Sequence, residues 1–213
     1  MKINTIRLRL ILGCLAILLP IIVSVLALVF GFLGDHIIPQ SISATYYMDP
    51  CITPFMGILV AAGILLICYQ GYDKQDDIVC TLAGIFGLCI CLFPCGASNL
   101  SHVGTFQIPI TISAWLHNIS AIVFFALLAY NSFFLFTKGS ENPTDNKKKR
   151  NIIYRICGIG MIGSFILLPI FTLLNIYGGT LIVELIALFF FGISWLTKCD
   201  IFPFLFCDSP YED

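Results

Sequence analysis

The sequence predicts an all-α integral membrane protein, built as a bundle of six transmembrane helices. Three observations support this fold class: 59% of the 213 residues are hydrophobic, only 11% are charged, and the apolar residues fall into long uninterrupted runs. A soluble domain carries about 25% charged residues, so this chain lacks the polar side chains that would cover a surface in water. The runs are close to or longer than the ~20 residues that cross a bilayer, and they lack the alternation of a barrel strand.

The six runs are expected to form a single membrane domain, because a helix pairs its own backbone N–H and C=O groups within lipid. The first run follows Lys2, Arg7 and Arg9, as a signal peptide would. It is longer than the roughly 7–15 apolar residues of a signal peptide, so we expect a membrane helix. A flexible cytoplasmic loop is predicted at 138–150 and a cytoplasmic tail at 199–213. The predicted spans are 9–34, 52–71, 78–96, 110–137, 152–176 and 179–198.

The basic residues predict the orientation of the bundle. If the N-terminus is cytoplasmic, all 11 lysines and arginines fall on the cytoplasmic side of the six spans. The intervening segments 35–51, 97–109 and 177–179 contain neither residue type. Cytoplasmic loops of membrane proteins are enriched in Lys and Arg. We therefore expect both termini in the cytoplasm.

Ionisable residues inside the predicted spans mark a candidate site. His117 lies in the fourth span and Glu184 in the sixth. An ionisable group at the centre of a membrane helix costs about 2.5–3.5 kcal/mol, which makes it a functional candidate. At ~1.5 Å per residue, both lie about 8–11 Å below the outer surface, so a His–Glu contact is geometrically allowed. The candidate polar pocket comprises Asp49, His117, Asn118 and Glu184, with Tyr46 and Tyr47 as a candidate lid.

Three interpretations of this polar cluster are open at the sequence level. It is a buried bridge that fixes helix register, a cavity for a lipid headgroup or small ligand, or a catalytic acid/base pair. A zinc site built from His36, His102 and His117, with an open water position, would also be chemically sensible. Alkaline ceramidases use histidines in this way, but their paired His-x-x-x-His on a late helix is missing here. We therefore assign no catalytic residue, no metal ligand and no cofactor.

Most of the ten cysteines fall in apolar spans, where free cysteine behaves as a small hydrophobic residue. Cys51 and Cys95 are expected near the outer surface. In an oxidising periplasm these two could form a disulfide. The sequence leaves both the disulfide and two free thiols open.

Two further features concern partners. A basic cluster precedes the fifth span and consists of Lys147, Lys148, Lys149 and Arg150. It is either a topology determinant or a docking patch for anionic lipid or for a soluble cytoplasmic partner. In a docking patch, each charge would add about 1 kcal/mol of binding free energy near a membrane surface. The cluster is short and lies between spans, so we expect no nucleic-acid partner. Small residues spaced four apart allow close helix packing, within one chain or in a homo-oligomer. They are Gly57/Ala61, Ala83/Gly87 and Gly160/Ser164.

Five stretches of the chain resemble a group of small six-helix bacterial membrane proteins. They are SISATYY (41–47), GILVAAGILLICYQGYDKQDD (57–77), LAGIFGLCICLFP (82–94), WLHNISAIVFF (115–125) and ELIALFFFGISWLTK (184–198). Proteins of that group read SISAYY and an acidic residue, then Y-x-G-Y, AG…LFP, LH…A…FF and E…FG-x-SWL-x-K.

The resemblance covers nearly the whole chain and implies its architecture and a bacterial inner (plasma) membrane location, but no activity. It also associates Asp49, His117 and Glu184 with recurrent motifs. The chain departs from the pattern at Cys51 and at the cysteines around 89–95.

Together these features favour a non-enzymatic membrane sensor or interaction module that responds to lipid, envelope state or a partner. A membrane component of a bacterial stress or phage-defence system is one setting that fits this class. The alternatives are a membrane-embedded lipid hydrolase using His117, Glu184 and Asp49, and a small-solute transporter. Unequal span lengths and the lack of a repeated motif weigh against a transporter with inverted halves.

Overall fold

The structure is a computed structural model, and it describes residues 5–33, 39–97, 100–139 and 143–199. The predicted all-helical fold with six candidate membrane spans is confirmed, since all six long helices have the length and hydropathy to cross a membrane. They are α1 (Thr5–Leu33), α2 (Asp49–Cys68), α3 (Lys74–Leu92), α4 (Ile110–Tyr130), α5 (Asp145–Leu173) and α6 (Gly179–Lys198).

Four short elements complete the described chain. A 3-10 helix, η1 (Ser43–Tyr47), precedes α2, and a π-helical turn, η2 (Asn131–Leu135), continues α4. The strands β1 (His102–Val103) and β2 (Ile108–Pro109) pair antiparallel in the α3–α4 connection, where the sequence predicted only a loop.

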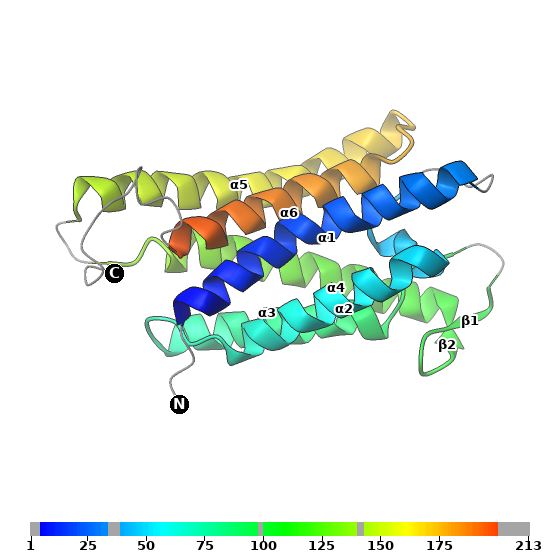
Figure 1. The fold of residues 1–213 in the computed structure, drawn as a ribbon, viewed down its shortest axis with the longest axis horizontal. Helices are drawn as coiled ribbons and strands as arrows, with labels where there is room; N and C mark the ends of the chain where they lie inside the picture. Colours follow the sequence, from blue (N-terminus) through cyan, green and yellow to red (C-terminus); the bar gives the residue numbers. More distant parts are fainter. Residues whose placement is uncertain (1–4, 34–38, 98–99, 140–142, 200–213) are drawn as a thin grey trace.

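The helices run alternately up and down the long axis of the molecule (Figure 1). Around the bundle, α5 packs on α6, α6 on α1, α1 on α2, α2 on α3 and α3 on α4. The pair α4 and α5 closes the ring with fewer contacts than these neighbours, and the turn η2 supplies much of the contact with α5. Away from η2, α4 and α5 therefore pack more loosely than the other neighbouring helices.

Charge is sorted along the bundle axis. The start of α1, the α2–α3 turn, the start of α5 and the end of α6 lie together at one end, which we call the basic end (Figure 1). The other end, which we call the opposite end, is formed by residues 39–48, 93–97, 100–109 and 174–178. Its described residues include no lysine or arginine.

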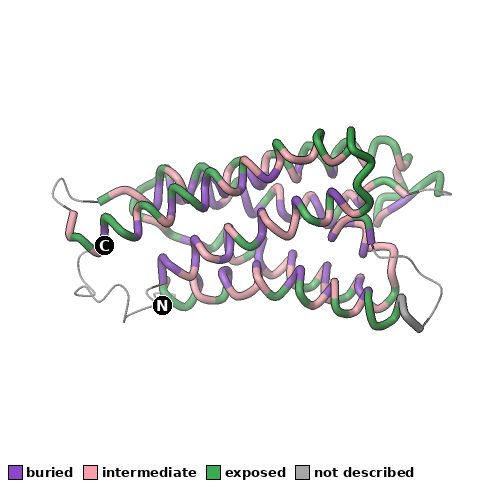
Figure 2. The backbone as a smooth tube through the Cα atoms, turned by 90° about the horizontal axis from the view of Figure 1, so that it is seen from above, coloured by how far each residue is buried: buried purple, intermediate pink, exposed green. Residues whose placement is uncertain are grey.

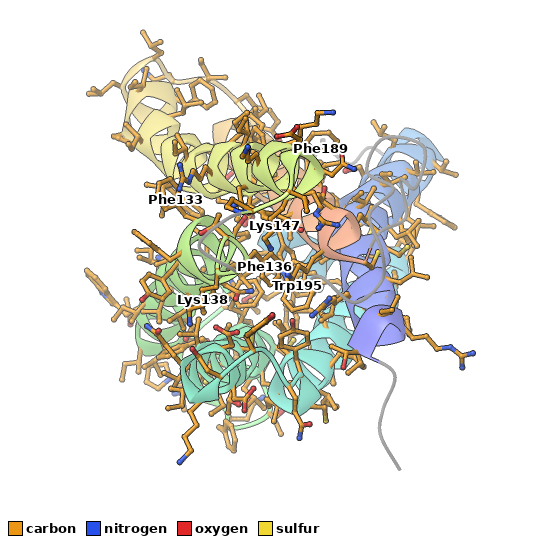
Figure 3. The ribbon with its side chains drawn as sticks, turned by 90° about the vertical axis from the view of Figure 1, so that its left-hand side faces the viewer. Phe133, Phe136, Lys138, Lys147, Phe189 and Trp195 are labelled. Carbon is orange, nitrogen blue, oxygen red and sulfur yellow. The ribbon has the colours of Figure 1, made fainter. Side chains whose placement is uncertain are left out.

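Side chains at the basic end join helices that are distant in sequence. Arg9 Nε donates to the Tyr69 hydroxyl at 3.2 Å, and Arg9 Nη1 donates to the Lys198 carbonyl at 3.1 Å. Trp195 packs edge-on against Tyr69 and Phe136, with ring centroids 4.9 and 5.1 Å apart. Viewed from this end, Phe136 and Trp195 lie near the middle of the bundle (Figure 3). Tyr69 of the Y-x-G-Y motif and Trp195 of the SWL-x-K motif therefore pack together at the basic end.

The acidic run after Gly71 caps α3. Asp73 Oδ1 accepts from the backbone N–H groups of Gln75 (2.9 Å) and Asp76 (3.2 Å), which would otherwise be unpaired at the helix start. Lys138 Nζ reaches Asp73 Oδ2 at 2.9 Å and Asp76 Oδ1 at 3.1 Å. The hydrogen bond from Lys138 holds the pKa of Asp73 below its usual range. This cluster therefore has a structural role.

Buried residues line the inner sides of the helices and exposed residues the perimeter (Figure 2). Helices α2 and α3 cross at Gly63 and Gly84, where a side chain on Gly84 would collide with the Gly63 carbonyl oxygen. Of the predicted small-residue positions, Gly160 lies against the Phe190 ring, whereas Gly57 has open space around it.

The helix ends differ from those predicted. α5 begins at Asp145 instead of 152, because the Thr144 hydroxyl accepts from Lys147 N–H and caps the helix in the polar segment. Lys147–Arg150 are therefore helical and do not belong to a loop. α2 likewise begins at Asp49, with a proline in its first turn. Hydropathy marks the apolar part of a helix, and capping extends it beyond that part. The predicted tail at 199–213 lies outside the described residues apart from Cys199.

Candidate functional site

A cavity of about 680 Å³ lies among α4, α5, α6 and the segment before η1, near the opposite end. Both His117 and Glu184 border it. Apolar side chains, including Phe125, Phe165 and Ile166, form most of its wall. Its polar and thiol-bearing residues are Ser41, Ser43, Cys95, His117, Asn118, Thr172, Thr180 and Glu184.

Glu184 lies in the second turn of α6 and holds the segment before η1. The Ile42 backbone N–H donates to Glu184 Oε2 at 2.5 Å, and the Ser43 hydroxyl donates to Oε1 at 3.2 Å. A further backbone bond, from Leu181 N–H to the Gln40 carbonyl at 3.0 Å, fixes the same segment on α6. Both carboxylate oxygens are thus hydrogen-bonded, while the partly buried group still borders the cavity.

His117 is 3% exposed and completes the end of α3. Its Nδ1 lies 2.8 Å from the Phe93 carbonyl oxygen. One helical turn earlier, the Ser113 hydroxyl donates to the Pro94 carbonyl at 2.7 Å. Residues four apart share one face of a helix, so α4 presents both donors to the two carbonyls that directly follow α3. These carbonyls have no helical partner after α3 ends.

The Tyr46–Tyr47 pair forms part of the same scaffold. The Tyr47 hydroxyl donates to the Cys95 carbonyl at 2.6 Å, and the two tyrosine rings are edge-on with centroids 5.0 Å apart. Burial, followed by the proximity of Cys95 and Tyr46, raises the pKa of Tyr47 to about 12. Neither tyrosine borders the cavity. The residues that cover its polar end from this segment are Ser41 and Ser43.

The structure separates the remaining predicted site residues. His117 and Glu184 border one cavity but are not hydrogen-bonded to each other, because each has backbone partners of its own. Asn118 is exposed and borders the cavity. Asp49 is the exposed first residue of α2 and lies outside it. The predicted pocket therefore loses Asp49 and gains the hydroxyls of Ser41, Ser43, Thr172 and Thr180.

Cys51 and Cys95, the candidate disulfide pair, are both free thiols in the structure. The Cys51 thiol is buried and donates to the Val23 carbonyl, with Sγ and oxygen 3.6 Å apart. Cys95 faces the cavity, where burial and then the charge of Glu184 raise its pKa to about 12. Its thiol is therefore protonated at neutral pH.

No group of three or more His, Cys, Asp or Glu side chains able to hold a metal ion occurs within the described residues. His102 lies in β1, exposed, with Nδ1 3.2 Å from the Ser101 hydroxyl. His36, the third histidine considered from the sequence, lies outside the described residues.

A second, apolar hollow of about 470 Å³ follows the seam between α4 and α5. We call it the α4–α5 groove. Ala126, Ile162 and Ile166 border both the groove and the cavity, so the two adjoin each other. Gly163 also lines the groove, with open space where a side chain would project. Together they form a polar chamber with an apolar extension.

The basic cluster does not form one exposed patch. Lys147 and Arg150 are buried at 5% and 3% exposure, whereas Lys148 and Lys149 are exposed. Lys148 Nζ pairs with Asp145 Oδ1 at 2.9 Å. Lys147 Nζ donates to the Phe136 carbonyl at 3.4 Å, in the interior of the end view (Figure 3).

Comparison of the chain with models of protein families, with curated proteins and with solved structures finds no match in any of the three. The class that the fold defines is a six-helix protein compatible with multi-pass membrane insertion.

Proposed function

We propose that this protein is a non-enzymatic multi-pass membrane protein that binds one amphipathic molecule among α4, α5 and α6 and acts as its sensor. The observation that carries the proposal is that the cavity, with its few polar side chains, adjoins the apolar α4–α5 groove. Ligand sites are concave and mostly apolar, have a few polar groups, and measure about 300–1,000 Å³. A headgroup fits the polar chamber and a hydrocarbon chain fits the groove.

The sorted charges support an orientation for this site. We place the basic end in the cytoplasm and the cavity in the outer half of a bacterial inner membrane, because lysine and arginine favour the cytoplasmic side. The looser α4–α5 seam then faces the lipid, so a ligand can enter sideways from the membrane. At the cytoplasmic end, the exposed Lys148 and Lys149 are where a soluble partner would dock.

The contacts of His117 favour binding over hydrolysis. A nucleophile needs a base within hydrogen-bond reach, and that base needs an orienting partner. His117 Nδ1 contacts a main-chain carbonyl, and its ring has no hydrogen bond with Glu184 or a hydroxyl. The Ser43 hydroxyl contacts Glu184, whose other oxygen is occupied by the Ile42 N–H. These are the bonds of a scaffold.

Blocking the groove tests the proposal. Gly163→Leu places a side chain in the open part of the groove, and Gly57→Leu is the matched control, because Gly57 also has open space but lies on α2. Displacing two methylene groups forfeits about 1.6 kcal/mol, so we expect binding to weaken about tenfold or more.

The full chain is equilibrated in micelles with hexadecylamine and hexadecanol. Native mass spectrometry of the protein released from these micelles then counts the bound molecules. The proposal predicts one saturable molecule in the wild type and in Gly57→Leu, and much less in Gly163→Leu. Equal binding by the two variants would contradict it.

A further inference from the structure

Glu184, Ser43 and Thr172 offer a ligand in the cavity hydrogen-bond acceptors, whereas Ser41, Thr180, Asn118 and Cys95 also carry donor groups. An ionised carboxylate has no proton to donate, and Glu184 already accepts from Ile42 N–H and the Ser43 hydroxyl. The Ser43 proton is thereby used, and the Thr172 hydroxyl proton is used by the Leu168 carbonyl at 2.9 Å. What these three side chains still offer to a ligand is oxygen lone pairs.

His117 adds another acceptor. The Phe93 carbonyl oxygen can only accept, so the proton belongs on Nδ1 of the ring. This assignment of the tautomer follows from the bonding partner. In the neutral ring Nε2 is then an acceptor, and His117 is one of the residues that border the cavity.

The described residues that line the cavity include an acidic side chain but no lysine or arginine. The acidic side chain is Glu184. An ionised group away from water is costly unless it is paired, and acidic residues within membrane spans usually have a partner of opposite charge. A ligand that brings a positive charge would provide that partner.

We propose that the ligand is a single-chain amphiphile whose headgroup is a primary ammonium. This inference rests on the proposed function and specifies the class of its ligand. The three N–H groups of the ammonium donate to Glu184 and to the neighbouring acceptors of Ser43, Thr172 and His117. The hydrocarbon chain follows the α4–α5 groove past Gly163.

The same lining disfavours other headgroups. A phosphate or carboxylate needs donors, and an anion beside Glu184 meets a like charge. A trimethylammonium keeps the positive charge but has no N–H group to donate. An alcohol has one donor and no charge. The predicted order of affinity is therefore primary amine first, then alcohol, then carboxylate.

Ligand competition tests this order. Pairs of amphiphiles are offered to the full chain at neutral pH, and native mass spectrometry measures the ratio in which the two members of each pair are bound. The amphiphiles are hexadecylamine, hexadecanol, hexadecanoate, hexadecyltrimethylammonium and an ethanolamine lysophospholipid. Close charge pairs at protein interfaces are worth about 1.5 kcal/mol or more, so we expect the wild type to prefer the amine over the alcohol at least about tenfold. Glu184→Gln should retain hexadecanol and lose most of the preference.

The outcomes separate the two proposals. Equal binding of amine and alcohol by the wild type, or an unchanged amine preference in Glu184→Gln, would overturn the ammonium assignment and leave amphiphile binding in place. Preferred binding of the trimethylammonium or of the lysophospholipid would also overturn it, and these arms use only the wild-type chain. Amphiphile binding that Gly163→Leu does not weaken would overturn the proposed function itself.

Discussion

Replacing Ser113 with alanine removes one hydroxyl from the joint between α3 and α4. Ser113 is fully buried, and its Oγ donates to the Pro94 carbonyl at 2.7 Å. The residue does not border the cavity. The substitution therefore tests whether the side chains of α4 hold the end of α3, separately from any ligand.

The expected loss follows from the burial of the carbonyl that remains. A typical hydrogen bond contributes about 0.5–1.5 kcal/mol net, but a buried acceptor left without a partner costs about 1–3 kcal/mol. Alanine recovers up to about 0.7 kcal/mol through its higher helix propensity. We expect Ser113→Ala to lower the free energy of unfolding by about 1–2 kcal/mol.

The assay is reversible unfolding of the purified chain in mixed micelles by a denaturing detergent, followed by circular dichroism. Ser24→Ala is the matched control, because the buried Ser24 hydroxyl has no hydrogen-bond partner among the described residues and its loss should cost nothing. If the two variants unfold at the same detergent fraction, the α3 cap does not contribute as argued.

Three further predictions concern packing, pH and a buried amide. Gly84→Ala should lower the free energy of unfolding by about 1–3 kcal/mol, measured in the same assay, because the new methyl group meets the Gly63 carbonyl oxygen. Burial, and then Cys95, raise the pKa of Tyr47 to about 12. The raised pKa contributes to the free energy of unfolding; this contribution is complete below the unfolded-state pKa near 10 and is lost as pH rises through 12. The unfolding curves of the wild type and of Tyr47→Phe should therefore converge between these two pH values. Asn131 is 1% exposed with no hydrogen bond to its side-chain amide, so Asn131→Leu should raise the thermal unfolding temperature.

Hydropathy was sufficient to predict the number and type of the helices, since only a helix pairs its backbone within each apolar run. It could not predict where the helices end. Thr144 caps α5 ahead of a run of charges, and Asp73 caps α3 after Gly71. Such ends depend on single polar side chains in short connections, which an average over many residues conceals.

The candidate site was predicted in part. The depth of His117 and Glu184 suggested a contact between them, whereas in the structure both line one cavity without a hydrogen bond to each other. The spacing of Ser113 and His117, four residues apart, was a signal for a shared partner that could have been used. The bond from Ile42 N–H to Glu184 depends on the folded path of the segment before η1. The loose seam between α4 and α5 is a property of the whole bundle, so no local pattern reports it.

Photo-crosslinking tests most directly whether an amphiphile occupies the α4–α5 cavity. Hexadecylamine with a diazirine in the middle of its chain would be irradiated with the full-length protein in nanodiscs, and labelled peptides would be identified by mass spectrometry. The account predicts labels at Ala126, Ile162 and Ile166 that excess unlabelled amine displaces. Labels spread over the lipid-facing sides of α1, α2 and α3, and undiminished by competitor, would contradict it.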